Sequence, residues 1–356
     1  MDSVDSVDRV WGGIEGGGTK FRCILGRGMH ADEIVAEQTI PTTTPAETLG
    51  AVGDFFARYL HQQPQRRHRR KMTLAGLGIA CFGPIDLVPT SPRFGSITST
   101  PKPGWSHVDV VGVLRSHLRL PGSVPVAWET DVNGALIAEQ RWGAAQGLAS
   151  AVYFTVGTGV GGGALVEGHP LHGLIHPEMG HIPVSVPVAL PEPRSPTINP
   201  ASAAASGPDA PSQGTPHVMR PAPAGVCPFH DGRCLEGVAS GPALAQRAGR
   251  PAATIPPDDP LWEEEAYYLA SAAVVATLLL SPQRIIFGGG VVLHQPHLLP
   301  RIRAQFLAQL NGYVRHPTIT DHVATYVVAP QLGNRAGVLG ALALAMDASG
   351  AAPAPG

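Results

Sequence analysis

The chain has 356 residues and a mass of 37.0 kDa, a length that favours two domains over one. Its 25 Lys and Arg against 27 Asp and Glu give a formal net charge of −2, which offers no overall field for binding nucleic acid or an anionic membrane. An apolar content of 44% excludes wholesale disorder, and four cysteines are too few for a disulfide scaffold. The polar, acidic start MDSVDSVD and the lack of a long apolar run predict a cytoplasmic protein.

Strand and helix patterns alternate along the chain. The first half predicts strands at 14–25 and 33–40, an amphipathic helix at 46–60, strands at 74–80 and 126–128, and a helix at 132–141. The second half predicts strands at 151–156 and 163–166, helices near 241–248 and 261–280, a strand at 285–287, a helix at 298–310, a strand at 323–328 and a closing helix at 336–346. Two successive α/β blocks, each opened by a strand and a glycine-rich turn, predict two similar lobes with a cleft between them.

Composition shifts mark the expected boundaries. The stretch 186–224 is rich in Pro, Ala and Ser and poor in large apolar residues, so we expect a flexible insertion. We expect disorder at 1–11 and 348–356. The first lobe is expected at 12–133, completed by the helix 336–347, and the second lobe at 134–335. The basic run 66–71 is interpreted as a solvated loop rather than a nucleic-acid patch.

Three glycine clusters follow or lie within predicted strands. They are Gly16-Gly17-Gly18-Thr19-Lys20, Gly157-Thr158-Gly159 with the glycines that follow, and Gly288-Gly289-Gly290. Glycine allows the backbone to approach an anion and to point several N–H groups at it, although a single such turn is more often only a hairpin. None matches the P-loop or the dinucleotide-binding pattern. Three turns on two lobes favour a nucleotide held from both sides, with the phosphates at the first two and the adenosine at the third.

Asp131 lies where a predicted strand gives way to a helix. Its local sequence, taken alone, favours a residue that only caps the helix. The functional alternative is a general base, which takes the proton from a substrate hydroxyl as that hydroxyl attacks a phosphorus atom.

Cysteine and histidine gather near the end of the insertion. Cys227, His230 and Cys234 form a C-x2-H-x3-C pattern, and His181 lies just before the insertion. Two thiolates and two imidazoles complete a tetrahedral structural zinc site. The alternative is a pair of buried thiols beside surface histidines. We favour zinc, which would hold both ends of the insertion in one place. Cys23 and Cys81 are expected in the core.

Several strings occurring in order resemble the fructokinase branch of the ROK sugar kinases. They are GIEGGGTK from Gly13, FGPIDL from Phe82, TPKPGW from Thr100, ETDVNG from Glu129, TGVGGG from Thr158, HPEMGH from His176, CLEG from Cys234 and FGGGV from Phe287. The resemblance covers about residues 12 to 345. It implies an α/β, actin-like ATPase fold of two RNase H-like lobes around a nucleotide and sugar cleft, and a homodimer. It also implies transfer of phosphate from MgATP to a hexose, with fructose giving fructose 6-phosphate in this branch.

The resemblance also implies roles for single residues. Asp131 would be the catalytic base. The residues near ATP would be Gly17, Gly18, Thr19, Lys20, Thr158, Gly159, Gly288, Gly289 and Gly290. Sugar hydroxyls would be bound by Asn133, Glu178 and Glu236. A structural zinc ion would be held by His181, Cys227, His230 and Cys234, and Mg²⁺ would accompany ATP.

The chain departs from the family pattern at several places. Most ROK glucokinases carry Asp in place of Glu15 and Asn in place of Thr130, so both residues point away from glucose. The common zinc motif C-x-C-x4-C is replaced by C-x2-H-x3-C, and the insertion is long. A kinase for mannose, glucose or an N-acylmannosamine, and a non-catalytic sugar-binding protein, remain alternatives. We do not expect a DNA-binding repressor, because only about a dozen residues precede the first glycine motif.

Overall fold

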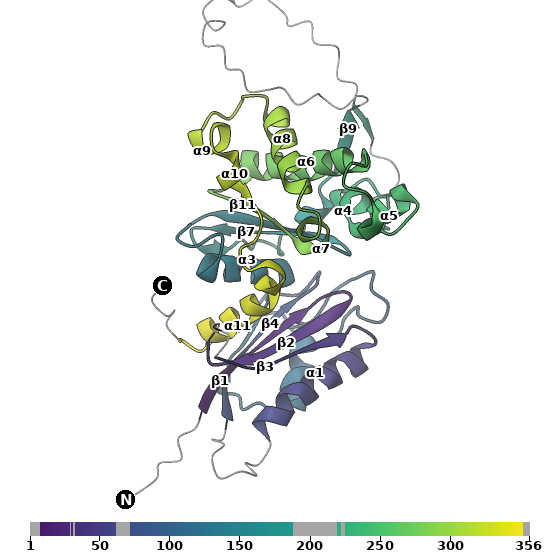
Figure 1. The fold of residues 1–356 in the computed structure, drawn as a ribbon. Coiled ribbons are helices and arrows are strands. Elements are labelled where there is room, and N and C mark those ends of the chain that lie inside the picture. Colours follow the sequence, from purple (N-terminus) through teal and green to yellow (C-terminus); the bar gives the residue numbers. More distant parts are fainter. Residues whose placement is uncertain are drawn as a thin grey trace, which may run out of the picture.

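The computed structural model describes residues 8–28, 30, 33–61, 72–187, 219–221 and 225–351. These residues form two five-stranded sheets with helices on their outer faces and between them (Figure 1). The basic run 66–71 and most of the expected insertion lie outside the described residues, and so do residues 1–7 and 352–356 of the two ends.

The first sheet has the strand order β3-β2-β1-β4-β5. Its strands are β1 (Asp8–Gly16), β2 (Lys20–Gly26), β3 (Ile34–Pro41), β4 (Met72–Cys81) and β5 (Val126–Thr130). The first three are antiparallel, whereas β1, β4 and β5 run parallel. Helices α1 (Pro45–Leu60) and α2 (Val110–His117) contribute apolar side chains to the core on one face of this sheet. Helix α1 begins with a capping box, in which Thr44 and Glu47 each accept the other's backbone N–H.

The second sheet repeats this topology. Its strands are β6 (Ala151–Val156), β7 (Val160–Val166), β8 (His169–Pro170), β11 (Ile285–Gly288) and β12 (Val327–Val328). Their order is β12-β11-β6-β7-β8, with β6, β7 and β8 antiparallel and β6, β11 and β12 parallel. In both sheets the chain therefore lays down three antiparallel strands and then adds two parallel ones beside the first. The two predicted α/β blocks fold as two copies of one arrangement.

Most remaining elements belong to the second half of the chain. The helices are α4 (Leu235–Ala239), α5 (Gly241–Ala248), α6 (Leu261–Leu280), α7 (Gly289–Leu293), α8 (Leu298–Leu310), α9 (Pro317–Thr320) and α10 (Val323–Tyr326). Among the described residues, the 3-10 helices are η1 (Met179–His181), η3 (Ala252–Thr254) and η4 (Gly333–Arg335). Strands β9 (Ser185–Pro187) and β10 (Met219–Pro221) pair with each other, so the two ends of the expected insertion lie side by side.

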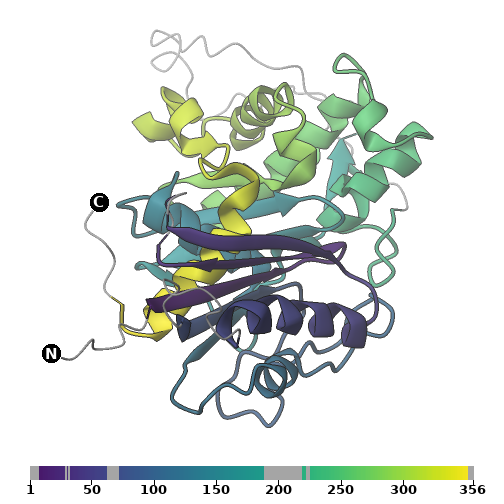
Figure 2. The ribbon, with the colours of Figure 1, turned by 60° about the horizontal axis from the view of Figure 1, so that its bottom comes forward.

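Two helices fill the space between the sheets. Helix α11 (Ala336–Ala348) packs on β1 and β4 of the first sheet, and α3 (Asp131–Trp142) contacts β6 and β7 of the second. The two helices also pack on each other, and Figures 1 and 2 show α11, in yellow, between the purple strands and the second sheet. Glycines allow this close packing, since a methyl group on Gly340 would overlap the carbonyl oxygen of Gly134. Helix α11 thus packs against both the first sheet and α3, the helix that follows this sheet in the chain.

The structure corrects several sequence expectations. The segment 14–25 is not one strand, because the glycine turn between β1 and β2 reverses the chain, with Gly17 N–H donating to the Lys20 carbonyl. Strand β1 starts at Asp8, inside the segment expected to be disordered, because it pairs with β4 from Asp8 onward and buries Val10. Of 323–328, only the last two residues pair with β11, and the first four form α10. Short apolar runs such as this one carry no clear period.

The ends of the other expected segments also differ. Helix α11 continues to Ala348, and residues 186–187 and 219–221 of the expected flexible insertion belong to strands. Helices α2, α4, α7 and α9 were not predicted. They are eight residues or shorter, so each gives too few turns for a helical period to stand out.

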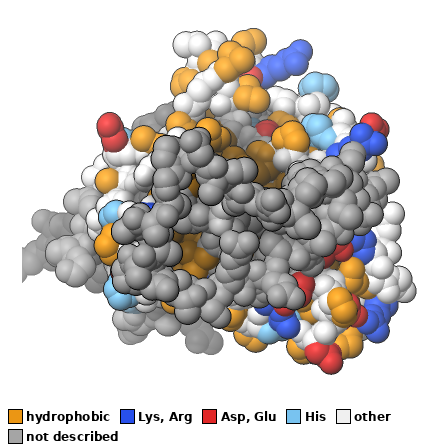
Figure 3. All heavy atoms as spheres, turned by 90° about the horizontal axis from the view of Figure 1, so that it is seen from above, with side chains coloured by type: hydrophobic (Ala, Val, Ile, Leu, Met, Phe, Trp, Pro, Cys, Tyr) orange, Lys and Arg blue, Asp and Glu red, His pale blue; other side chains and the backbone are white. Residues whose placement is uncertain are grey.

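The surface agrees with a chain of nearly balanced charge. On the described part of the face in Figure 3, Lys and Arg side chains lie among Asp, Glu and hydrophobic ones instead of forming an area of one sign. Among the helices in the described residues, none combines the length and the apolar character needed to cross a membrane.

We predict that Gly340→Ala lowers the midpoint of denaturant unfolding, because the added methyl group meets the α3 backbone and overpacking of this kind costs about 1–3 kcal/mol. Gly50→Ala in α1 is the matched control, because a methyl group there meets open space and the change should raise stability by up to about 1 kcal/mol. Equal effects of the two substitutions would contradict the close contact between α3 and α11.

Candidate active site

The glycine turns lie at the carboxyl ends of parallel strands, where ligands bind in open α/β sheets. The first follows β1 of the first sheet, and the second follows β6 of the second sheet. Their threonines meet, with the hydroxyl oxygens of Thr19 and Thr158 3.2 Å apart. Both hydroxyls and the side chain of Lys20, the first residue of β2, are exposed. The structure therefore brings the first two turns together from opposite sheets.

The third glycine cluster adjoins the second. Gly288 ends β11 and Gly289 begins α7. Gly289 has φ +83°, and a side chain there would overlap the backbone of Val156, the last residue of β6. Both its conformation and its contact thus require glycine. The three predicted turns form one continuous region across the two sheets.

Asp131 is the first residue of α3, and it does not cap the helix. The N-cap is Thr130, whose side-chain oxygen accepts the N–H of Asn133 at 3.2 Å. The Asp131 carboxylate accepts the N–H of Val132 at 2.8 Å. Burial raises the pKa of Asp131 to about 6, although hydrogen bonds from the backbone oppose this rise. At neutral pH the group is mostly ionised yet basic enough to accept a proton.

Two further carboxyl groups interact electrostatically with Asp131. Burial raises the pKa of Glu15 to about 7; the nearby Arg22 lowers it and Asp131 adds to the rise. Burial likewise raises the pKa of Glu178 to about 7, with contributions from Asp131 and Glu236. Negative charge therefore concentrates around Asp131. The proximity of Glu15 to Asp131 is not evident from the sequence, because only the fold brings the end of β1 beside the start of α3.

The side chain of Asn133 does not face solvent. It is buried, and its amide donates to the Glu129 carboxylate at 3.1 Å. Its carbonyl oxygen lies against Gly163, where a side chain would overlap it, and has no hydrogen-bond partner among the described residues. The same Glu129 oxygen accepts the N–H of Thr130 at 2.7 Å. Asn133 and Glu129 thus brace the turn that presents Asp131.

Glu236 connects the second glycine turn to the cysteine and histidine cluster. One carboxylate oxygen accepts the N–H of Val160 at 3.0 Å, and a side chain on Gly159 would overlap that oxygen. The other oxygen lies 4.0 Å from Nε2 of His181. Glu236 is the second residue of α4, whose N-cap is Cys234.

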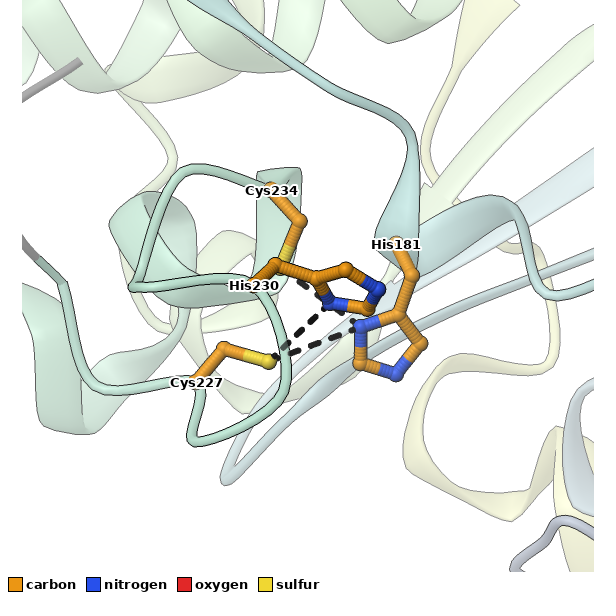
Figure 4. A group of neighbouring side chains, drawn as sticks. All are labelled: His181, Cys227, His230 and Cys234. Atoms are coloured by element: carbon orange, nitrogen blue, oxygen red, sulfur yellow. Dashed lines mark hydrogen bonds between the residues drawn. The ribbon is translucent and has the colours of Figure 1, made fainter.

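The four predicted metal ligands come together (Figure 4). One ligand atom from each of His181, Cys227, His230 and Cys234 lies within 4.8 Å of the other three. Nδ1 of His181 is 3.8 Å from Sγ of Cys227 and 3.5 Å from Sγ of Cys234. Nδ1 of His230 is 3.4 Å from Sγ of Cys227. Bond lengths of 2.0–2.3 Å to a tetrahedral zinc ion imply ligand separations of about 3.3–3.8 Å, and these three separations fall in that range.

The other two cysteines take no part in this cluster. Cys23 and Cys81 are fully buried in the core of the first sheet, as expected.

Comparison with known proteins places the chain in a family. The model of the ROK family matches residues 11–348. The chain is 38% identical to a fructokinase of Pediococcus pentosaceus over 339 residues, which cover 95% of this chain and 98% of that protein. It is 39% identical to a fructokinase of Zymomonas mobilis over 343 residues, which cover 96% and 97% of the two chains.

Solved structures agree on the fold. A ROK family glucokinase of Streptomyces griseus, in complex with glucose and AMPPNP, is similar with a TM-score of 0.64 at 23% identity, covering 95% of this chain and 99% of that one. A ROK hexokinase of Thermus thermophilus gives a TM-score of 0.63 at 24% identity, with 94% and 97% covered. The expected two-lobed, actin-like α/β fold is confirmed. By its sequence over nearly the full length and by its fold, the chain belongs to the ROK family.

Proposed function

We propose that this ROK sugar kinase is an ATP-dependent fructokinase, which transfers the γ-phosphoryl group of MgATP to D-fructose and releases fructose 6-phosphate and ADP. The two fructokinases matched over nearly their whole length support the substrate class. The observation that carries the proposal is the place of Asp131, a half-buried carboxylate with a pKa near 6 at the start of α3.

Phosphoryl transfer needs a base beside the attacking oxygen and donors around the phosphates. In our proposal Asp131 accepts the proton of the fructose hydroxyl while its oxygen forms a bond to the γ-phosphorus, and the bond from that phosphorus to ADP breaks. The exposed hydroxyls of Thr19 and Thr158, with Lys20, support binding of the phosphates between the two sheets. The backbone N–H groups of Gly18 and Gly159 would add to these donors, and Gly17, whose N–H donates to the Lys20 carbonyl, would hold the first turn in shape.

The third turn and the remaining carboxylates complete the proposed site. Gly288, Gly289 and Gly290 would lie against the adenosine, next to the end of β6. Glu178 and Glu236 would accept hydrogen bonds from sugar hydroxyls, and the electrostatic interaction of Glu178 with both Asp131 and Glu236 supports a shared pocket. Asn133 would contribute indirectly, because its side-chain amide already donates a hydrogen bond to the Glu129 carboxylate. The Mg²⁺ ion that accompanies ATP would offset the concentrated negative charge.

We also propose that His181, Cys227, His230 and Cys234 hold a structural zinc ion. The spacing of the four ligand atoms supports it. The ion would fix the start of α4, which carries Glu236, beside His181. The homodimer that the family resemblance implies remains part of the proposal.

We predict that Asp131→Asn lowers kcat with fructose by roughly 10²–10⁴-fold, because the amide cannot accept the proton. The KM for ATP should stay within about twofold. In the wild type, kcat/KM for fructose should fall as the pH drops through about 6, because protonation removes the base. Asp109→Asn is the control: Asp109 caps α2 by accepting the N–H of Gly112 at 2.7 Å, and its loss should leave kcat unchanged. A variant at position 131 that keeps most of its turnover would remove Asp131 from the mechanism.

We predict about one zinc ion per chain in the purified protein, measured by elemental analysis. Cys234→Ser should lose the ion, lower the melting temperature and raise the KM for fructose, because the start of α4 would no longer be fixed. Cys23→Ala removes a buried thiol outside the cluster and should keep the ion. Native protein without zinc would refute the metal site.

A further inference from the structure

The segment 171–178 links the two sheets near the proposed sugar site. It follows β8 of the second sheet and ends at Glu178, just before η1. Two of its histidines contact residues of the first sheet or of the loop that follows β4. Nε2 of His172 lies 2.8 Å from a carboxylate oxygen of Glu129 on β5, and Nε2 of His176 accepts the N–H of Ile85 at 3.0 Å.

His176 is oriented by its contacts on both sides. Its side chain is 4% exposed. Because Nε2 accepts the N–H of Ile85, the ring proton lies on Nδ1. Nδ1 is 3.5 Å from a carboxylate oxygen of Glu178. Burial lowers the pKa of His176, which favours this neutral form. The ring thus stands between the loop after β4 and the carboxylate proposed to bind sugar.

His172 provides the second contact. The Glu129 carboxylate uses one oxygen for Thr130 N–H and the amide of Asn133, and the other for His172. A hydrogen bond from His172 to Glu129 raises the pKa of the histidine and favours its charged form. The Glu129 carboxylate therefore connects His172 to Thr130, the residue that caps α3 and precedes Asp131.

Little apolar burial holds the middle of the segment. Leu174 is 94% exposed and Ile175 is 63% exposed. Between the two histidines, the one backbone hydrogen bond within the described segment runs from Gly173 N–H to the carbonyl of Ile175 at 3.1 Å. Hydrophobic packing therefore does not fix the middle of this segment, and the two polar contacts have to do so.

We propose that His172 and His176 are positioning residues that clamp the segment 171–178 to the first half of the molecule and so set the affinity for the hexose. This inference rests on the proposed function, because it acts through Glu178 as a sugar ligand. It assigns neither histidine a part in the chemical step. Because the clamp acts on sugar binding, we expect a change in the KM for the sugar and a much smaller change in the KM for ATP.

Steady-state kinetics with MgATP and fructose test this on four variants. His176→Ala should raise the KM for fructose about tenfold, the loss expected for about 1.4 kcal/mol of hydrogen bonding, while the KM for ATP stays within about twofold. His176→Gln should recover part of the loss, because its amide oxygen can accept the N–H of Ile85. His172→Ala should raise the KM for fructose about threefold. His169→Ala is the matched control, since His169 is an exposed residue of β8, and it should match the wild type.

Thermal melting shows which variants fold. His172 is 42% exposed, so His172→Ala still tests the inference if His176→Ala does not melt cooperatively. An unchanged KM for fructose in every folded variant, or an equal rise in both KM values, would overturn the clamp. A wild-type protein that phosphorylates no hexose would instead refute the proposed function together with this inference.

Discussion

The site depends on the position of one carboxylate, that of Glu236. One of its oxygens accepts the N–H of Val160 at the second glycine turn, and the other lies 4.0 Å from Nε2 of His181 in the cysteine and histidine cluster. A histidine that binds a metal through Nδ1 is commonly oriented by a carboxylate at its other nitrogen. Cys234 caps the same short helix two residues before Glu236. The proposed zinc site, phosphate site and sugar site thus share one turn of helix.

Electrostatics around Asp131 follow from this convergence. Glu15 comes from the first sheet, Glu178 and Glu236 come from the second half, and Asp131 starts the helix between the sheets. Desolvation and repulsion by neighbouring carboxylates raise the pKa values of Glu15 and Glu178 to about 7. Burial raises the pKa of Asp131 to about 6. Such a cluster is costly in an empty protein and favours a cationic ligand. The Mg²⁺ ion of MgATP would supply positive charge to this site.

Local patterns predicted the elements whose period is clear over several residues. Strand β6 and helices α5, α6 and α8 have the expected bounds. The cysteine and histidine spacing predicted a cluster that the fold assembles, with His181 joining from 46 residues before Cys227. The proximity of Glu15 to Asp131, and the contacts of His172 and His176 with the first half, could not be predicted. Each depends on how two distant segments pack, and neither leaves a periodic signal in the sequence.

The most direct test is kcat/KM with MgATP for fructose, mannose, glucose and N-acetylmannosamine, measured in one coupled assay on the wild-type protein. We expect fructose to give the highest value, with fructose 6-phosphate as the product. A higher value for another hexose would keep the fold and the proposed base but contradict the substrate. Absence of turnover with all four sugars would contradict the kinase activity itself.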